Sequence, residues 1–263
     1  MDIIKAKDII IDFIGKKLEG TGIEGAVVGI SGGIDSALVA YLSVEALGAE
    51  NVLGIHMPEA STPESEIEDA KKVAEALGID LKVVDITSVL EGYRSAMPDI
   101  EDTSAYVDGN LKARIRMSML YYYANMLGRV VMGTGNKSEI LLGYFTKYGD
   151  GGVDMEPIGD LYKTEVWKMS KILGVQESIL EKAPSAGLWE GQTDEEDLGV
   201  SYETIDKVLQ PILAGEGRER VHLKLGVPME DINSILLRVR SNLHKRATPP
   251  IAHLDDLRDD WLS

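Results

Sequence analysis

Cysteine is absent from the 263-residue chain, and basic residues are outnumbered, with 27 Lys and Arg against 44 Asp and Glu. The absence of cysteine excludes disulfides, thiolate metal sites and a cysteine nucleophile. The formal net charge of −17 argues against nucleic-acid binding, because such binding depends on Lys and Arg to neutralise phosphates. Against this acidic background, a local group of basic residues is informative about the charge of a ligand.

Long apolar runs are missing as well. No stretch of about eighteen apolar residues occurs, so we expect no membrane span. Residues 1–8 include Asp2 and Asp8 where a secretory signal would be basic, and no small-residue cleavage site is visible. We therefore expect a cytoplasmic protein, and the length and composition are typical of a globular chain with a sizeable core.

Short apolar segments alternate with helical patterns in the first half of the chain. Helices are expected over residues 2–18, 65–77 and 108–127, and strands over 26–30, 51–58, 81–86 and 129–134. Strands alternating with helices predict a doubly wound parallel sheet with helices on both faces, the α/β fold class.

The second half of the chain has a different pattern. A helix capped by Asp160 or Thr164 is expected to run to Leu173, and further helices are expected over 202–213, 215–225 and 229–244. Between them, residues 186–199 contain three glycines and an acidic run, which favours a mobile surface loop. No linker is visible, so we expect residues 1–263 to form a single domain with a helical C-terminal extension.

The segment Ser31–Ser36 follows an apolar strand and opens a helix. Its two glycines allow positive φ and a close approach of phosphate oxygens to backbone N–H groups, and Ser36 lies near the positive end of the helix dipole. The lysine of the common phosphate loop is missing, and Asp35 is present instead. A carboxylate beside a phosphate needs a cation between them, so this segment predicts magnesium. The alternative is an ordinary strand–turn–helix junction capped by Ser31.

Two further polar residues, Thr134 and Glu139, follow the predicted strand over 129–134. Ligands bind beyond the carboxyl ends of parallel strands, so these residues can converge with the Ser31–Ser36 segment. Asp35 and Glu139 would then supply hard oxygen ligands to magnesium. The alternatives are a solvent-exposed Glu139 and a Thr134 that caps a helix.

Several sequence blocks resemble those of the NAD synthetase family. The segment 31–36 (SGGIDS) resembles the pyrophosphate loop of the ATP pyrophosphatase superfamily, whose members cleave ATP to AMP and pyrophosphate. The resemblance becomes specific in other blocks: 133–139 (GTGNKSE), 143–154 (GYFTKYGDGGVD), 184–195 (PSAGLWEGQTDE) and 244–246 (HKR). Together they span most of the chain and imply an adenine nucleotide alpha-hydrolase-like fold.

The resemblance also implies roles for individual residues. Asp35, Lys163 and Asp150 are the implied catalytic residues, and Asp35 and Glu139 the implied magnesium ligands. The implied ATP contacts are Gly29, Ile30, Ser31, Gly32, Gly33, Ile34, Asp35, Ser36, Thr134, Lys163 and Ser185. The implied contacts to the dinucleotide deamido-NAD are Arg114, Lys147, Asp154, His244 and Lys245.

Some of these residues have structural alternatives. Asp150 lies between glycines and could be a turn-forming aspartate rather than a base for ammonium. Arg114 could be an ordinary surface charge. The run 121–123 of three tyrosines favours packing over base stacking, and the side chain of His56 is expected to be packed.

The reaction implied by the family is ammonia-dependent NAD synthesis. The nicotinate carboxylate of deamido-NAD attacks ATP to give an adenylated dinucleotide, and ammonia then displaces AMP. Glutamine-dependent members carry an extra amidase domain with a cysteine nucleophile, which this chain lacks. Residues 186–199 are the candidate lid, and the family implies a homodimer through the long helix that contains Asn110. A GMP synthetase-like ATP pyrophosphatase and a non-catalytic nucleotide-binding protein remain alternatives.

Overall fold

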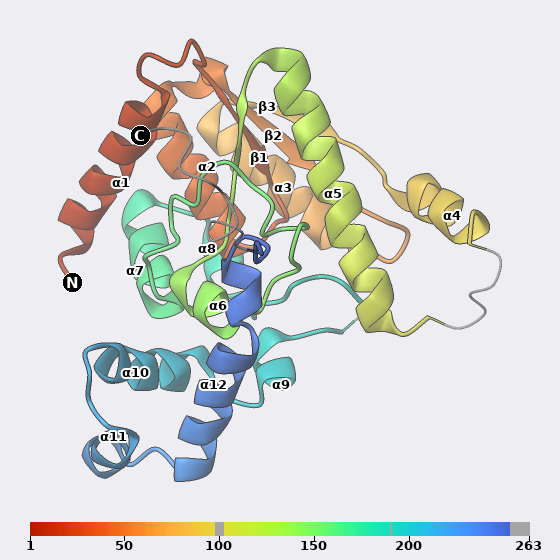
Figure 1. Cartoon of the computed structure of the whole chain (residues 1–263). Coiled ribbons are helices and arrows are strands. Elements are labelled where there is room, and N and C mark those ends of the chain that lie inside the picture. The colour runs from red at the N-terminus through yellow and green to blue at the C-terminus, as the bar shows by residue number, and fades with distance from the viewer. Residues whose placement is uncertain (98–102, 190, 253–263) are drawn as a thin grey trace, which may run out of the picture.

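The computed structural model describes residues 1–97, 103–189 and 191–252 (Figure 1). Its centre is a four-stranded sheet with the order β3-β2-β1-β4. The strands are β1 (Ala26–Gly29), β2 (Val52–His56), β3 (Asp80–Val83) and β4 (Val130–Met132), and every pairing is parallel. Val27 pairs with Leu53 on one side and with Val131 on the other. The predicted parallel sheet is confirmed.

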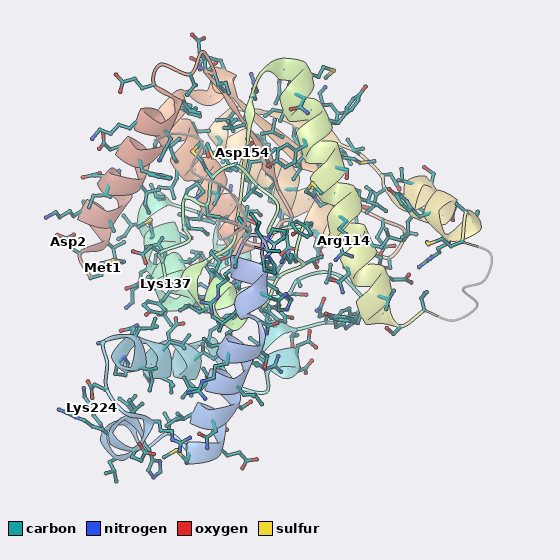
Figure 2. The ribbon with its side chains drawn as sticks, in the orientation of Figure 1. Met1, Asp2, Arg114, Lys137, Asp154 and Lys224 are labelled. Carbon is teal, nitrogen blue, oxygen red and sulfur yellow. The ribbon has the colours of Figure 1, made fainter. Side chains whose placement is uncertain are left out.

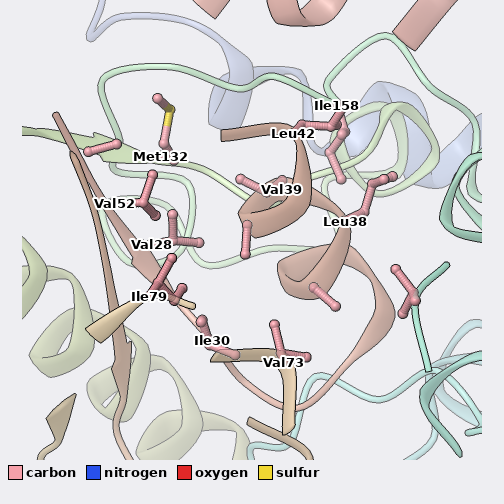
Figure 3. Close-up of a cluster of buried hydrophobic side chains, with 14 of the residues drawn as sticks. Val28, Ile30, Leu38, Val39, Leu42, Val52, Val73, Ile79, Met132 and Ile158 are labelled. Atoms are coloured by element: carbon pink, nitrogen blue, oxygen red, sulfur yellow. The ribbon is translucent and has the colours of Figure 1, made fainter. Parts of the chain in front are cut away.

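One face of the sheet is covered by four helices: α1 (Ile3–Leu18), α2 (Ile34–Leu47), α3 (Glu64–Leu77) and α7 (Lys163–Leu173). Val28, Ile30 and Met132 project from the sheet toward Leu38 and Leu42 of α2 (Figure 3). These sheet residues alternate with Val27 and Leu53, which belong to the cluster on the other face. Burial on both faces explains why the strands are continuous apolar runs.

The opposite face packs against the long helix α5 (Ala105–Leu127), and α4 (Thr87–Ser95) lies beyond it (Figure 1). Helices on both faces confirm the doubly wound arrangement. α4 was not predicted from the sequence. Only Leu90 is fully buried in it, so its apolar face is too small to give a clear helical period.

The C-terminal part forms a helical lobe below the sheet domain (Figure 1). It contains α9 (Asp194–Leu198), α10 (Tyr202–Leu213), α11 (Arg218–Leu225) and α12 (Met229–Ser241), followed by the 3-10 turn η2 (Leu243–Arg246). Tyr202 and Ile232 are buried together with Leu142 of α6 (Lys137–Leu142), so the lobe packs directly on the segment that follows β4. The short elements η1 (Ala49–Asn51) and α8 (Glu177–Leu180) complete the described fold.

The structure changes two predictions in the second half of the chain. Neither Asp160 nor Thr164 caps α7; its N-cap is Tyr162, whose N–H donates to the carboxylate of Glu165 (3.0 Å). Residues 186–199 are not entirely a surface loop, because their acidic run forms α9 and Asp194 is buried. No helix of the described residues is long and apolar enough to cross a membrane.

Candidate active site

A cavity of about 600 Å³ opens at the carboxyl ends of β1, β2 and β4. It is lined by the segment 29–36, by α5, by the segment after β4 and by residues 182–189. Of the residues expected to contact ATP, those lining the cavity are Gly29, Ile30, Ser31, Gly32, Gly33, Ile34, Asp35, Ser36, Thr134, Lys163 and Ser185. The whole expected ATP set therefore shares one site.

The segment 31–36 forms a tight loop at the start of α2. Gly32 has φ +84°, and a Cβ at this position would lie 2.7 Å from the carbonyl oxygen of Glu66. The hydroxyl of Ser36 donates to the carbonyl of Gly33 (3.0 Å) and accepts from the N–H of Ser31 (3.1 Å). The loop is thus shaped around glycine, and it presents the N-terminal end of a 14-residue helix to the cavity.

Lys163 occupies the centre of an ionic cluster in the cavity wall. Its Nζ donates to Asp35 Oδ2 at 2.6 Å and to Glu139 Oε1 at 3.1 Å, and its side chain is 2% exposed. Asn136 adds a third link, because its Nδ2 donates to Asp35 Oδ1 (2.9 Å) while its N–H donates to Glu139 Oε2 (3.2 Å). Three segments distant in the sequence therefore meet at one ammonium group.

Burial and charge act in opposite directions in this cluster. Burial alone would lower the pKa of Lys163, but the carboxylates of Asp35 and Glu139 outweigh it and raise that pKa. Burial raises the pKa of Glu139 above its ordinary value, against the opposing effect of Lys163. Lys163 is therefore a permanent cation at the place where two carboxylates face the cavity.

The donor set of this cluster fits magnesium. Magnesium commonly takes one or two protein carboxylates and completes its shell with phosphate oxygens and waters. Asp35 Oδ1 and Glu139 Oε2 face away from Lys163, and each accepts one hydrogen bond from Asn136. A carboxylate oxygen has two lone pairs, so both atoms keep acceptor capacity. The described residues contain no group of three or more metal-ligating side chains, so the substrate would have to complete the site.

Tyr202 and Asp194 of the C-terminal lobe pack against the ionic cluster. The phenol of Tyr202 donates to Asp194 Oδ2 (3.0 Å) and lies 3.4 Å from Glu139 Oε1. The Tyr202 ring centroid lies 5.1 Å from Nζ of Lys163, within the range of a cation–π contact. No sequence pattern had predicted Asn136, Tyr202 or Asp194 as a site residue, although Asn136 and Asp194 lie inside the blocks that carry the resemblance.

The residues expected to contact the dinucleotide are only partly brought together. Arg114 Nη2 donates to the carbonyl of Lys147 (3.3 Å), and Lys147 Nζ donates to the carbonyl of His244 (2.7 Å). Lys245 lines the cavity and donates to the carbonyls of two residues of the 143–154 block (2.7 and 2.8 Å). These contacts link Arg114, Lys147 and His244 through backbone carbonyls, and of the four residues only Lys245 lines the cavity. The four are called the basic group below.

Asp154 lies apart from that basic group. Its carboxylate accepts from the phenol of Tyr121 (3.0 Å) and from the N–H of Val131 (2.8 Å), next to β4. Figure 2 labels Asp154 near the sheet and Arg114 on α5. A direct contact of Asp154 with the dinucleotide therefore stays a prediction.

The structure shows which contacts are made by the site residues that had a structural alternative. Asp150 closes a turn by accepting from the N–H of Thr146 (2.9 Å), and it also lines the cavity. His56 is buried with Nδ1 2.7 Å from the carbonyl of Ile30, which confirms the prediction of a packed side chain. Asn136, rather than Thr134, caps α6, and the hydroxyl of Ser185 accepts from the N–H of Gly187 (3.1 Å).

Three further basic residues line the cavity, and none was singled out as a site residue: Arg116, Lys182 and Arg238. Arg238 donates to the carbonyl of Asp197 (2.7 Å). Arg116 donates to the carbonyl of Met57 (3.1 Å). Lys182 pairs with Asp69 (2.8 Å) and reaches the carbonyl of Gly32 (3.3 Å). Together with Lys163 and Lys245 they make five basic residues in the lining, beside six acidic ones: Asp35, Glu66, Glu139, Asp150, Asp194 and Asp197. The lining is therefore mixed in charge, and an anionic ligand would depend on local basic groups rather than on an excess of positive charge.

Comparisons with known proteins agree with this geometry. Residues 7–249 match the family model described as NAD synthase. The NH3-dependent NAD+ synthetase of Methanococcoides burtonii is 89% identical over 263 residues, which is 100% of both chains. Among solved structures, an NMN synthetase from Francisella tularensis has a TM-score of 0.86 at 33% identity, covering 97% of this chain and 100% of its own. An NH3-dependent NAD synthetase from Campylobacter jejuni, in complex with nitrate, has a TM-score of 0.81 at 34% identity, covering 96% and 100%.

These matches extend over nearly the whole chain, including the loop 31–36, the ionic cluster around Lys163 and the C-terminal lobe. The fold is therefore that of a C–N bond-forming ligase. The chain belongs to the NAD synthase family.

Proposed function

We propose that this enzyme makes NAD from deamido-NAD, ATP and ammonia in two steps within the one cavity. In the first step, a carboxylate oxygen of the nicotinate group attacks the α-phosphorus of ATP, and pyrophosphate leaves. In the second, ammonia attacks the carbonyl carbon of the adenylated dinucleotide and loses a proton. The bond between that carbon and the bridging oxygen breaks, and AMP leaves with the oxygen. The observation that supports this most is the ionic cluster of Lys163, Asp35 and Glu139 beside a glycine loop of matching sequence.

In this proposal, the loop 31–36 and each residue of the ionic cluster have separate roles. The N-terminal end of α2 and the 31–36 loop bind the pyrophosphate part of ATP. Lys163 neutralises the charge that grows on the α-phosphate as the carboxylate attacks. Asp35 and Glu139 are the residues that would hold magnesium, which when bound supplies Lewis-acid withdrawal of charge from the phosphate oxygens. Asn136 keeps both carboxylates oriented.

The second substrate and ammonia are assigned to the other side of the cavity. Arg114, Lys147, His244 and Lys245 form the basic group that suits a dinucleotide with two phosphates and a carboxylate. Asp150 is assigned to accept a proton from ammonium there. With no cysteine in the chain, a thiol amidase is excluded, so the nitrogen source is free ammonia or a separate partner. The cytoplasmic location and the single domain stay predictions.

The exposed face of α5 supports the proposed homodimer. Tyr122 is 71% exposed and Met126 60%, and Leu127 continues the same apolar patch. Beside them is a groove lined mainly by apolar side chains of α4, α5 and the end of β3: Val84, Val89, Tyr93, Ile115, Ser118, Met119, Tyr122 and Tyr123. A surface of this kind on a helix that also carries Arg114 fits a contact between two copies near the dinucleotide site.

A substrate panel tests the proposal. Purified protein is given ATP, magnesium and ammonium with either deamido-NAD or the corresponding mononucleotide, and NAD, NMN, AMP and pyrophosphate are measured. We expect NAD with one AMP and one pyrophosphate per NAD, and little product when glutamine replaces ammonium. Asp35→Ala is the control, and full turnover by this variant would contradict the metal assignment.

The mononucleotide is tested because a similar solved structure is that of an enzyme that makes NMN. The structure most similar by TM-score among those compared above, at 0.86, is that of an NMN synthetase. The chemistry would be the same, because the nicotinate carboxylate is adenylated and amidated in both cases. If the mononucleotide is turned over faster than deamido-NAD, the proposed activity changes from NAD synthesis to NMN synthesis. The cavity would then need no site for the second nucleotide.

A further inference from the structure

Residues 183–189 form a strap over the cavity. The strap leaves α8, reaches the N-terminal end of α5 and turns back toward α9 (Figure 1). All seven of its residues line the cavity, while Ser185, Ala186 and Gly187 are also exposed to solvent. The strap therefore separates the cavity from bulk water at this point.

A buried ion pair joins the strap to α5. Lys112 Nζ donates to the carbonyl of Leu188 (2.9 Å) and to Glu59 Oε1 (2.8 Å). The two charged side chains are only 9% and 11% exposed. One ammonium group thus connects the strap, the helix and the loop between β2 and α3.

The surface of α5 is also shaped to receive the strap. Gly109 lies one helical turn before Lys112, and a Cβ at this position would lie 2.9 Å from Cβ of Leu188. Glycine in the middle of a helix is unfavourable relative to alanine, so this glycine is costly unless the close approach is needed. Leu188 rests in the space that the missing side chain leaves.

The other end of the strap is fixed independently. Lys182, immediately before it, pairs with Asp69 (2.8 Å) and reaches the carbonyl of Gly32 in the phosphate loop (3.3 Å). The strap thus begins at the ATP site and is held at its far end by Lys112. Loss of the Lys112 contact would free the far end while leaving the near end in place.

The ion pair is insensitive to pH in any ordinary assay. Burial alone would raise the pKa of Glu59, but hydrogen bonds from Lys112 and Ser61 outweigh it and lower the pKa to about 2. The carboxylate therefore stays ionised well below neutrality, and substitution is the practical way to open the contact.

We propose that Lys112 and Glu59 are positioning residues that hold the strap closed on α5 and so keep water from the adenylated intermediate. This rests on the proposed function, in which that intermediate forms in the cavity. With the strap open, water attacks the carbonyl carbon in place of ammonia, AMP leaves and the free carboxylate is regenerated. ATP is then consumed without formation of NAD.

The test compares Lys112→Met with Arg94→Met. Arg94, on α4, pairs with Asp108 of α5 and makes no hydrogen bond to the strap among the described residues, so its loss controls for a lost ion pair on α5. Two quantities are measured: pyrophosphate released per NAD formed, and the rate of chymotryptic cleavage after Leu188 or Trp189. We expect Lys112→Met to raise both, with cleavage about tenfold faster, the effect of one lost charge-assisted hydrogen bond. Arg94→Met should leave both unchanged.

A second variant guards against misfolding of Lys112→Met. Gly109→Ala leaves every charge in place and favours the helix, but its Cβ would displace Leu188. It should also raise pyrophosphate per NAD and speed cleavage in the strap. The proposal is overturned if Gly109→Ala keeps one pyrophosphate per NAD and the wild-type cleavage rate. If wild-type protein forms no NAD, the proposed function fails, and the cleavage rates alone still decide whether Lys112 holds the strap.

Discussion

At the level of single residues, one buried ammonium group, that of Lys163, is central to the proposed reaction. Lys163 is held by Asp35 and Glu139, so the three side chains form a nearly closed ionic cluster. Removing one partner from such a cluster leaves uncompensated buried charge, which is more damaging than the loss of an exposed pair. The same ammonium group pairs with Asp35 in the loop 31–36, which is proposed to bind ATP.

Lys163→Met tests this assignment. We expect kcat/KM for NAD formation to fall by about 10²–10³-fold, the usual effect of removing one preorganised charge donor. Lys168→Met is the matched control, because Lys168 lies on the same helix and is exposed. Initial rates and thermal unfolding are measured for both variants. Near wild-type activity of a folded Lys163→Met protein would contradict the role given to this residue.

Glu156 carries a residue-scale prediction about pH. Burial raises its pKa to about 8, although the N–H of Gly135 donates to it (3.1 Å). The folded protein therefore holds a proton that the unfolded chain releases above pH 4.5, so stability falls as the pH rises from about 4.5 to about 8.

Glu156→Gln removes that titration. The variant should match the wild type in stability near pH 5 and unfold at a higher temperature than the wild type near pH 9. The expected difference in the free energy of unfolding at pH 9 is a few kcal/mol, since one pKa unit corresponds to about 1.4 kcal/mol. The readout is the midpoint of thermal unfolding across this pH range. Parallel pH profiles for the two proteins would show that Glu156 is ionised in the folded state at neutral pH.

The burial of Lys163 illustrates what the sequence does not reveal at this scale. A lysine in the first turn of a helix is ordinarily solvated, and only the resemblance singled it out. Its burial depends on carboxylates that are 128 and 24 residues away in the chain. Local periodicity contains no information about such long-range neighbours.

At the level of secondary-structure elements, the backbone geometry of the loop 31–36 shapes the proposed ATP site. Gly32 combines a positive φ with a close approach to Glu66. Several glycines at helix ends have the positive φ without the close approach, although Gly143 at the end of α6 has both. Gly78, at the C-terminal end of α3, has φ +65° and no neighbouring atom within 4 Å of a Cβ position.

The pair Gly32→Ala and Gly78→Ala separates these two effects. Both should lose about 1–2 kcal/mol of stability through left-handed strain. Only Gly32→Ala must also displace the loop, so we expect it alone to raise KM for ATP by an order of magnitude or more. Equal KM values for the two variants would show that the loop tolerates a side chain at position 32.

Regular elements with strong local signals were predictable from the sequence. The helix predicted over 65–77 is α3, which ends at Gly78, and all four strands lie within one residue of the predicted segments or inside them. The start of α7 was less predictable, because its cap depends on Glu165 reaching back to Tyr162. α9 was also missed; its first residue, Asp194, is buried and accepts a hydrogen bond from the phenol of Tyr202 on the next helix (3.0 Å). Tertiary contacts decide such short elements.

At the scale of the whole molecule, the C-terminal lobe completes the site. Its core includes Leu142 of α6, and Tyr202 lies beside the Lys163 cluster. This packing is consistent with one domain over residues 1–263, a boundary that stays a prediction.

The homodimer is the second prediction at this scale. Tyr122→Asp places a charge in the apolar patch of α5, so we expect the protein to sediment as a monomer. Leu223→Asp is the control, because Leu223 is 82% exposed on α11, away from that patch. Analytical ultracentrifugation measures both variants. A Tyr122→Asp protein that stays dimeric would place the interface elsewhere.

In the proposed reaction, the nicotinate carboxylate attacks the α-phosphorus of ATP. Deamido-NAD labelled with ¹⁸O at both oxygens of that carboxylate tests this step directly: it is incubated with ATP, magnesium and ammonium, and the products are measured by mass spectrometry. We expect one ¹⁸O atom in AMP, one in the amide of NAD and none in pyrophosphate, because the C–O bond breaks when ammonia displaces AMP. Unlabelled AMP, or label in pyrophosphate, would contradict this step.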